Sequence, residues 1–212
     1  MPRPIRALLF DVEGVIAQPD RAAADRGLAG LAAGLDSRAV HAARNRPETY
    51  PLWERYSTGC LTREAYWSAI LEALEIPVEA EALEALLDIQ AATCWARLDA
   101  TLLARIAGLR GPRGPRLGLL SNSAPDHEPF IARFEADFDM AHFSHRTGRR
   151  KPQPEAYLAA LEALGAPPEA TLFVDDKPRN TEAAARLGLQ VWHYTGREAF
   201  EGELHRLGLD DG

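Results

Sequence analysis

Four short apolar runs punctuate the chain, and each is bounded by charged residues, Pro, Gly or Asn. They cover residues 5–10, 117–120, 171–174 and 189–194. Runs of this length with such boundaries are typical of buried strands. The first run leads directly into Asp11. We therefore predict buried strands that end in functional turns.

Helical patterns alternate with the later runs. Residues 154–164 carry apolar side chains at helical spacing, and residues 178–187 are Ala-rich and end before Gly188. Such spacing predicts amphipathic helices. Because strands that alternate with helices favour a parallel sheet, we predict an α/β fold with a three-layer α/β/α, Rossmann-like sheet.

A different pattern fills the chain from about residue 19 to residue 92, where strand-like runs disappear. The clearest helix follows Thr62, and its apolar residues from Trp67 to Leu74 form one stripe. We interpret this region as an inserted helical domain. The predicted domains are an α/β core, residues 1–16 and 93–212, and a helical domain, residues 17–92.

Composition and charge narrow the range of functions. Of the 212 residues, 46% are hydrophobic and 26% are charged, as in ordinary globular proteins. No apolar run approaches the roughly 20 residues of a membrane span, and the first residues lack a signal-peptide pattern, so we expect a soluble cytoplasmic protein. The formal net charge of -7 argues against general nucleic-acid binding, although it is compatible with a local positive pocket for a small anion. Composition and charge specify neither a protein partner nor an oligomeric state.

Polar side chains follow the predicted strands at positions where parallel sheets bind ligands. The candidates are Asp11, Glu13, Ser121, Asn122, Lys151, Asp175 and Asp176. Each of them alone has an ordinary explanation as a turn cap or a solvated side chain. Together, three carboxylates in one pocket repel one another unless a cation neutralises them, and oxygen ligands without Cys or His favour Mg²⁺. A lysine and a hydroxyl beside that ion would complete an oxyanion site for phosphate.

The order of these groups resembles the four motifs of the haloacid dehalogenase superfamily. The motifs read Asp-x-Glu-Gly-Val from Asp11, Ser-Asn from Ser121, Lys-Pro-x-Pro from Lys151 and Asp-Asp-x-x-x-Asn from Asp175, and they span essentially the whole chain. The helical domain resembles the cap that this superfamily inserts after its first strand. The motif spacing is similar to that of the subgroup containing the amino-terminal phosphatase of epoxide hydrolase.

The resemblance implies Mg²⁺-dependent hydrolysis of a small phosphorylated metabolite, with a role for each motif residue. Asp11 would be the nucleophile that forms an aspartyl-phosphate, and Glu13 stands at the acid/base position. The implied metal positions are Asp11, Val12 through its backbone carbonyl, Glu13, Asp175 and Asp176. The implied phosphate-binding residues are Ser121, Asn122 and Lys151, with Asn180 supporting the metal loop.

Glu13 departs from the family pattern, because phosphatases of this superfamily usually carry Asp there. The extra methylene displaces the carboxyl by roughly 1 Å, which can cost about 10²-fold in rate. One alternative is therefore a catalytically impaired protein that binds a phosphorylated ligand or has a regulatory role. A 2-haloacid dehalogenase is a further alternative, but that branch typically lacks the acidic pair found here at Asp175 and Asp176.

Other residues with chemical potential receive structural interpretations. Core packing is the preferred interpretation for three aromatic residues of the helical domain, Tyr50, Trp53 and Tyr56. Three histidines form no recognisable ligand set and are given no catalytic role: His127, His142 and His145. The two cysteines, Cys60 and Cys94, lack zinc-site spacing and are expected to be reduced. Cys60 lies in a loop that similar proteins direct into the active site, but a packing role is preferred for it.

Overall fold

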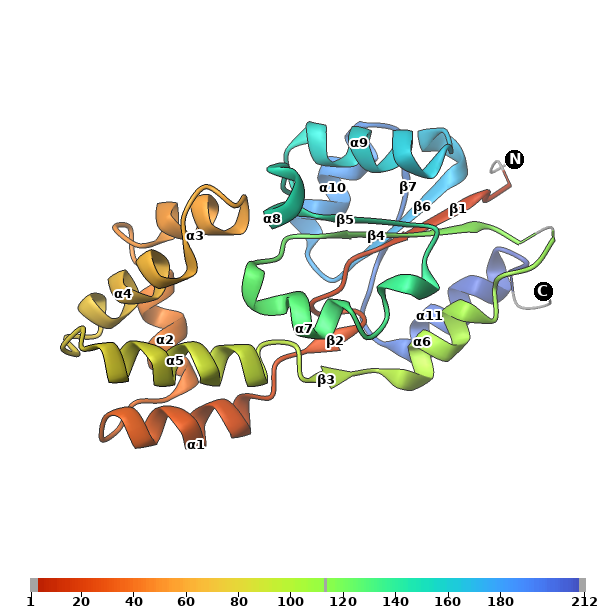
Figure 1. Cartoon of the computed structure of the whole chain (residues 1–212). Coiled ribbons are helices and arrows are strands. Elements are labelled where there is room, and N and C mark those ends of the chain that lie inside the picture. Colours follow the sequence, from red (N-terminus) through yellow and green to blue (C-terminus); the bar gives the residue numbers. More distant parts are fainter. Residues whose placement is uncertain (1–3, 113, 210–212) are drawn as a thin grey trace.

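The four apolar runs and a fifth segment that they did not predict, Met140–Phe143, form a five-stranded sheet in which neighbouring strands are parallel (Figure 1). The strand order is β5 (Met140–Phe143), β4 (Arg116–Ser121), β1 (Ala7–Phe10), β6 (Thr171–Asp175) and β7 (Gln190–His193). In the central strand, Phe10 is in register with Leu119 and Val174. The carboxyl ends of β1, β4 and β6 therefore meet at one edge of the sheet.

Helices cover both faces of this sheet. The computed structural model describes residues 4–112 and 114–209. One face carries α9 (Pro154–Leu164) and α10 (Pro178–Arg186). The other carries α6 (Ala100–Ala107), α7 (Glu128–Ile131) and α11 (Arg197–Arg206). Leu8 and Phe10 pack on the second face, whereas Ala7 and Leu9 pack on the first. Because both faces are buried, β1 reads as an uninterrupted apolar run, and the predicted three-layer α/β/α fold is confirmed.

Short segments connect these elements. They are η1 (Pro125–His127), η2 (Glu135–Asp137), α8 (Ser144–Thr147) and η3 (Pro168–Ala170). Within the described ranges, no helix has the length and apolar character needed to cross a bilayer.

Five helices form a separate lobe on one side of the sheet (Figure 1), which we call the cap lobe. They are α1 (Arg21–Leu31), α2 (Ser37–Arg44), α3 (Tyr50–Ser57), α4 (Arg63–Ala73) and α5 (Ala80–Thr93). The side chains of Asp20, Asp36 and Thr62 cap α1, α2 and α4 by accepting hydrogen bonds from backbone N–H groups. The lobe has its own apolar core, which includes Tyr56 and Trp67.

Two chain segments join the cap lobe to the sheet. They contain β2 (Ala17–Gln18) and β3 (Arg97–Leu98), which pair in antiparallel fashion. We propose a cap domain over residues 17–92 and a core over residues 1–16 and 93–212. Residues 1–3, 113 and 210–212 of that proposed core lie outside the described residues.

Candidate active site

Three carboxylates meet at the carboxyl edge of the sheet. Asp11 follows β1, Asp175 ends β6 and Asp176 comes next, and one oxygen of each lies within 4.8 Å of the others. Asp11 is 3% exposed and Asp175 is fully buried, so water screens their charges little. Burial raises the pKa of Asp11 to about 7, with the Asp175 carboxylate acting in the same direction. A cation at this cluster would favour the ionised form that a nucleophile requires.

Lys151 lies against the same cluster. Its Nζ is 2.8 Å from Asp11 Oδ1 and 2.6 Å from Asp175 Oδ2, and its side chain is 1% exposed. Burial acts to raise the pKa of Asp175, but the charge and hydrogen bond of Lys151, together with hydrogen bonds from Lys177 and Asn180, hold that pKa below its usual range. Asn122 fixes the Lys151 backbone through two hydrogen bonds of 2.8 Å. Its Oδ1 accepts from the Lys151 N–H, and its Nδ2 donates to the Lys151 carbonyl. Asn122 therefore positions Lys151 from the end of β4.

The loop after β6 is held by hydrogen bonds to Asp175. The backbone N–H of Lys177 donates to Oδ1 at 2.8 Å, and Asn180 Nδ2 lies 3.0 and 2.9 Å from the two carboxylate oxygens. Asn180 thus orients an acidic residue of the cluster. The loop after β1 closes on the same region, because a Cβ on Gly14 would lie 2.3 Å from the Asp176 carboxylate. Gly14 also has φ +93°, a conformation that favours glycine.

Three buried oxygens at this edge have no hydrogen-bond partner within the described residues. They are the Ser121 hydroxyl at the end of β4, Oδ1 of Asp176 and Oδ1 of Asn180. Buried polar atoms are rarely left without a partner, so each suggests a ligand. Three carboxylates with no Cys or His among them fit Mg²⁺, and the Ser121 hydroxyl with the Lys151 ammonium fits a phosphoryl group.

Glu13 lies outside the three-carboxylate cluster. Its Oε2 accepts a hydrogen bond from Trp95 Nε1 at 3.1 Å. Trp95 is fully buried and stacks on the ring of His127, with centroids 4.0 Å apart and planes 10° from parallel. Burial acts to raise the pKa of Glu13, but the charge of Lys177 leads the effects that lower it below its usual range. The Glu13 side chain is therefore held in its charged form by residues of the core and of the segment after α5.

The His127 ring that stacks on Trp95 is neutral. Its Nδ1 accepts from the backbone N–H of Ala124 at 2.8 Å, so in the neutral ring the proton is on Nε2. Burial lowers the pKa of His127 to about 4, so the ring is uncharged at neutral pH. Lys177 supplies a positive charge nearby: the carboxylates of Asp11 and Glu13 raise its pKa against the opposing effect of burial.

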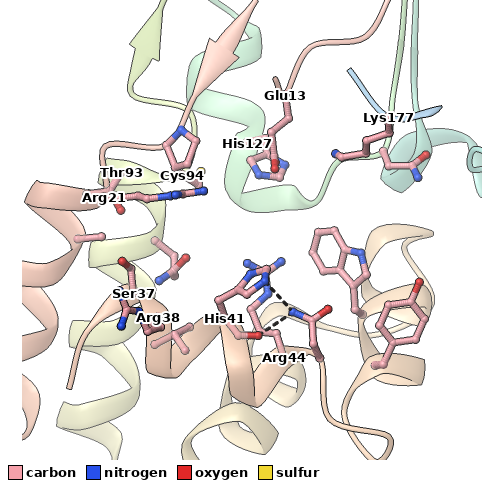
Figure 2. Close-up of a pocket in the computed structure, with 18 of the residues that line it drawn as sticks. Glu13, Arg21, Ser37, Arg38, His41, Arg44, Thr93, Cys94, His127 and Lys177 are labelled. Carbon is pink, nitrogen blue, oxygen red and sulfur yellow. Dashed lines mark hydrogen bonds between the residues drawn. The ribbon is translucent and has the colours of Figure 1, made fainter. Parts of the chain in front are cut away.

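A cavity of about 710 Å³ opens between the cap lobe and this edge of the sheet. Asp11, Glu13, His127 and Lys177 line its core side. Figure 2 shows His41 and Arg44 of α2 facing Glu13, His127 and Lys177 across it. The cavity is thus walled by two separate parts of the chain, as expected for a site that a cap encloses.

The structure modifies several expectations for the aromatic residues and the cysteine of the cap lobe. Tyr50 and Trp53 line the cavity instead of packing only in the lobe core, whereas Tyr56 is fully buried there. Cys60 is exposed and is not among the cavity-lining residues.

Sequence reasoning missed four residues of the site: Arg44, Trp95, His127 and Lys177. Only Lys177 carried a local signal, because it directly follows the acidic pair.

A family model described as haloacid dehalogenase-like hydrolase matches residues 5–188. A sesquiterpene phosphatase of Aspergillus oryzae is 28% identical over 158 residues, which cover 73% of this chain and 78% of that protein. A flavin mononucleotide hydrolase of Arabidopsis thaliana is 33% identical over 63 residues. That match covers 30% of this chain and only 26% of the length of that relative.

Solved structures share the fold over nearly the whole chain. A protein of Porphyromonas gingivalis described as a predicted HAD-like family hydrolase has a TM-score of 0.74 at 24% identity, covering 97% of this chain and 98% of its own. A HAD family enzyme of Bacteroides thetaiotaomicron, solved in complex with magnesium and inorganic phosphate, has a TM-score of 0.71 at 20% identity, covering 91% and 96%. An L-2-haloacid dehalogenase of Xanthobacter autotrophicus has a TM-score of 0.63 at 23% identity, covering 95% and 83%.

Proposed function

Because this chain belongs to the haloacid dehalogenase-like hydrolase family, we propose that it is a Mg²⁺-dependent phosphatase of a small phosphate monoester, acting through an aspartyl-phosphate on Asp11. The observation that carries this proposal is the cluster of Asp11, Asp175 and Asp176 with the Lys151 ammonium against it. The name of the A. oryzae relative and the magnesium and phosphate bound to the B. thetaiotaomicron enzyme support it.

The metal site proposed here contains Asp11, Asp175 and Asp176, with the Val12 carbonyl as a further position implied by the family pattern. The family pattern also implied Glu13, but its carboxylate lies outside this cluster on Trp95, so we assign it the acid/base role instead. When bound, Mg²⁺ would neutralise the carboxylate cluster and stabilise negative charge on the phosphoryl oxygens. On the protein side, the Lys151 ammonium and the free Ser121 hydroxyl provide donors for those oxygens. Positioning and charge stabilisation of this kind account for most of the catalysis in phosphoryl transfer.

The reaction then proceeds in two balanced steps. In the first, a carboxylate oxygen of Asp11 attacks phosphorus and the bond from phosphorus to the ester oxygen breaks. The leaving alkoxide takes its proton from the protonated form of Glu13, which is the minor form in the substrate-free site because the pKa of Glu13 is lowered there. In the second, water attacks phosphorus while Glu13 takes a proton from it, and the bond between phosphorus and Asp11 breaks. Inorganic phosphate is released, and both carboxyl groups return to their starting states.

Two other functions are weaker on specific grounds. The likeness to the L-2-haloacid dehalogenase is below 25% identity and concerns the fold, whereas the acidic pair at Asp175 and Asp176 favours phosphoryl chemistry. A catalytically impaired protein was suggested by Glu13 alone. The hydrogen bond from Trp95 gives the longer side chain a defined position, which supports an adapted acid/base group.

The test is release of inorganic phosphate from a panel of phosphorylated metabolites and an activated aryl phosphate, with Mg²⁺ and with chelator. We expect release that requires Mg²⁺ and is abolished by Asp11→Asn. Asp137→Asn is the matched control, because Asp137 is an exposed aspartate of η2 outside the cavity. Absence of release from every compound by folded, Mg²⁺-binding protein would contradict the proposed activity.

A further inference from the structure

Arg44, the last residue of α2, is fixed in the cavity wall by aromatic side chains. Its guanidinium lies over the Trp53 ring at 4.6 Å from the centroid, and its Nε donates to the Tyr66 hydroxyl at 2.9 Å. Tyr66 is fully buried in the core of the cap lobe. A guanidinium stacked in this way loses little further side-chain entropy when it binds a ligand.

No carboxylate within the described part of the chain lies at ion-pair distance from Arg44. Two of the other cations that line the cavity do have acidic partners at ion-pair distance. Arg150 pairs with Glu54 at 2.8 Å, and Lys151 pairs with Asp11 and Asp175. A rigidly held, partly buried cation without an acidic partner is costly unless an anion completes it.

The position of Arg44 relates it to the reacting centre. Arg44 and Asp11 line the same cavity from opposite walls, and Figure 2 shows Arg44 facing Glu13 and His127. A ligand whose phosphoryl group lies at Asp11 would therefore extend toward the cap lobe and meet the guanidinium. The planar guanidinium binds carboxylate or phosphate oxygens with two parallel hydrogen bonds.

We propose that Arg44 forms a second anion subsite, and that the substrate is a small phosphate monoester carrying another anionic group at its far end. That group is a carboxylate or a second phosphate. Trp53 and Tyr66 act as positioning residues for the guanidinium. This inference rests on the phosphatase function proposed above and narrows its substrate class.

A role for Arg44 limited to the electrostatics of Glu13 would affect every substrate alike. The charge of Arg44 does contribute to the lowered pKa of Glu13. An anion subsite instead affects only substrates that bear the second anion. The ratio of two substrates that differ in that one group separates the two roles, because any general effect on catalysis cancels.

The experiment compares straight-chain phosphate monoesters ending in a carboxylate with the same esters ending in a primary amide. A second series compares bisphosphates with the corresponding alcohol monophosphates, so that carboxylate and phosphate are distinguished. For each pair, kcat/KM is measured with Mg²⁺, and Kd is measured on Asp11→Asn protein to give a ratio independent of turnover. The variants are Arg44→Met, Arg44→Lys and the control Arg26→Met, which removes an exposed cation of α1 outside the cavity.

In at least one series, we expect the natural chain to prefer the ester that carries the second anionic group by about 10- to 100-fold, as is typical of a hydrogen-bonded charge pair. Arg44→Met should reduce that ratio to about one, Arg44→Lys should leave part of it, and Arg26→Met should leave it unchanged. Equal ratios for the natural chain and Arg44→Met, in both kcat/KM and Kd, would overturn the subsite. If no ester were hydrolysed but the Kd ratio still depended on Arg44, the phosphatase function would fail and the subsite would stand.

Discussion

Trp95 Nε1 donates a hydrogen bond to Glu13 Oε2 across 3.1 Å, and this contact joins the segment after the cap lobe to the loop after β1. Trp95 is itself fixed by stacking on His127. The donor lies where the longer glutamate side chain reaches it. Glu13 therefore differs from the family pattern in a way that its surroundings accommodate.

Glu13→Asp should lower kcat by about 10²-fold, even though it introduces the residue usual in the family. The shorter side chain moves the carboxyl by roughly 1 Å, away from Trp95, and misplacement of this size has such an effect. Steady-state kinetics on an activated aryl phosphate measure it. A higher kcat for Glu13→Asp would show instead that the natural chain is an impaired enzyme.

Trp95→Phe should lower kcat by roughly 10-fold and shift the pH profile. The substitution removes one hydrogen bond to a charged group, worth about 1.5 to 3 kcal/mol, but keeps an aromatic ring against His127. Because this bond helps to lower the pKa of Glu13, its loss raises that pKa, and the limb of the kcat/KM profile governed by Glu13 moves to higher pH. The control is Trp192→Phe, since the Trp192 indole N–H has no partner within the described residues. Superimposable profiles for Trp95→Phe and the natural chain would contradict this positioning role.

Asp126→Ala should lower the free energy of unfolding by about 3–5 kcal/mol, the usual effect of removing one partner of a buried charged network. The Asp126 carboxylate accepts from the Tyr56 hydroxyl at 2.6 Å and from Trp67 Nε1 at 3.0 Å, and it also pairs with Arg63. These donors belong to the cap lobe, whereas Asp126 lies in η1.

The milder change Tyr56→Phe removes one of these bonds to a charged group and should cost about 1.5 to 3 kcal/mol. Urea denaturation measures both variants. Asp137→Asn, at an exposed site, should stay within about 0.5 kcal/mol of the natural chain. An effect of Asp126→Ala no larger than that of Asp137→Asn would show that this network does not hold the cap lobe to the core.

His127 should make the folded state less stable as the pH falls from about 6.5 to 4. Burial lowers its folded-state pKa to about 4, so the unfolded chain binds the proton first. Its contribution is fully present above the unfolded pKa of about 6.5 and is lost on acidification, by up to roughly 3 kcal/mol. The difference in unfolding free energy between the natural chain and His127→Asn, followed over this range, isolates the effect. Asn keeps an acceptor for the Ala124 N–H, and parallel curves would contradict the prediction.

Four of the five strands of the sheet, and the residues at its edge, were predictable from sequence because their signals are local. The run before Asp11 and the run before Asp175 each read as a buried strand, and parallel strands end at a common edge. That rule alone brings the two aspartates together. Lys151 follows no predicted strand, and its place at the site was predicted from the Lys-Pro-x-Pro motif.

The rest of the site depends on how the cap lobe docks, which no local pattern encodes. Trp95 and Glu13 are 82 positions apart, and their contact requires the folded connection between lobe and core. Core packing was the preferred interpretation for Trp53, and nothing in the local sequence shows that this side chain borders a cavity. Similarly, the Ser-Asn motif identifies Asn122, whereas only the structure shows that its side-chain amide bonds both the N–H and the carbonyl of Lys151.

The central claim is that Asp11 carries the phosphoryl group, and chemical trapping tests it most directly. The protein is mixed with an activated aryl phosphate and Mg²⁺, quenched in acid, reduced with borohydride and digested for mass spectrometry. An aspartyl-phosphate is reduced to homoserine, so we predict homoserine at position 11 in the natural chain and not in protein treated with chelator. Phosphate release without any modification at position 11 would contradict the account.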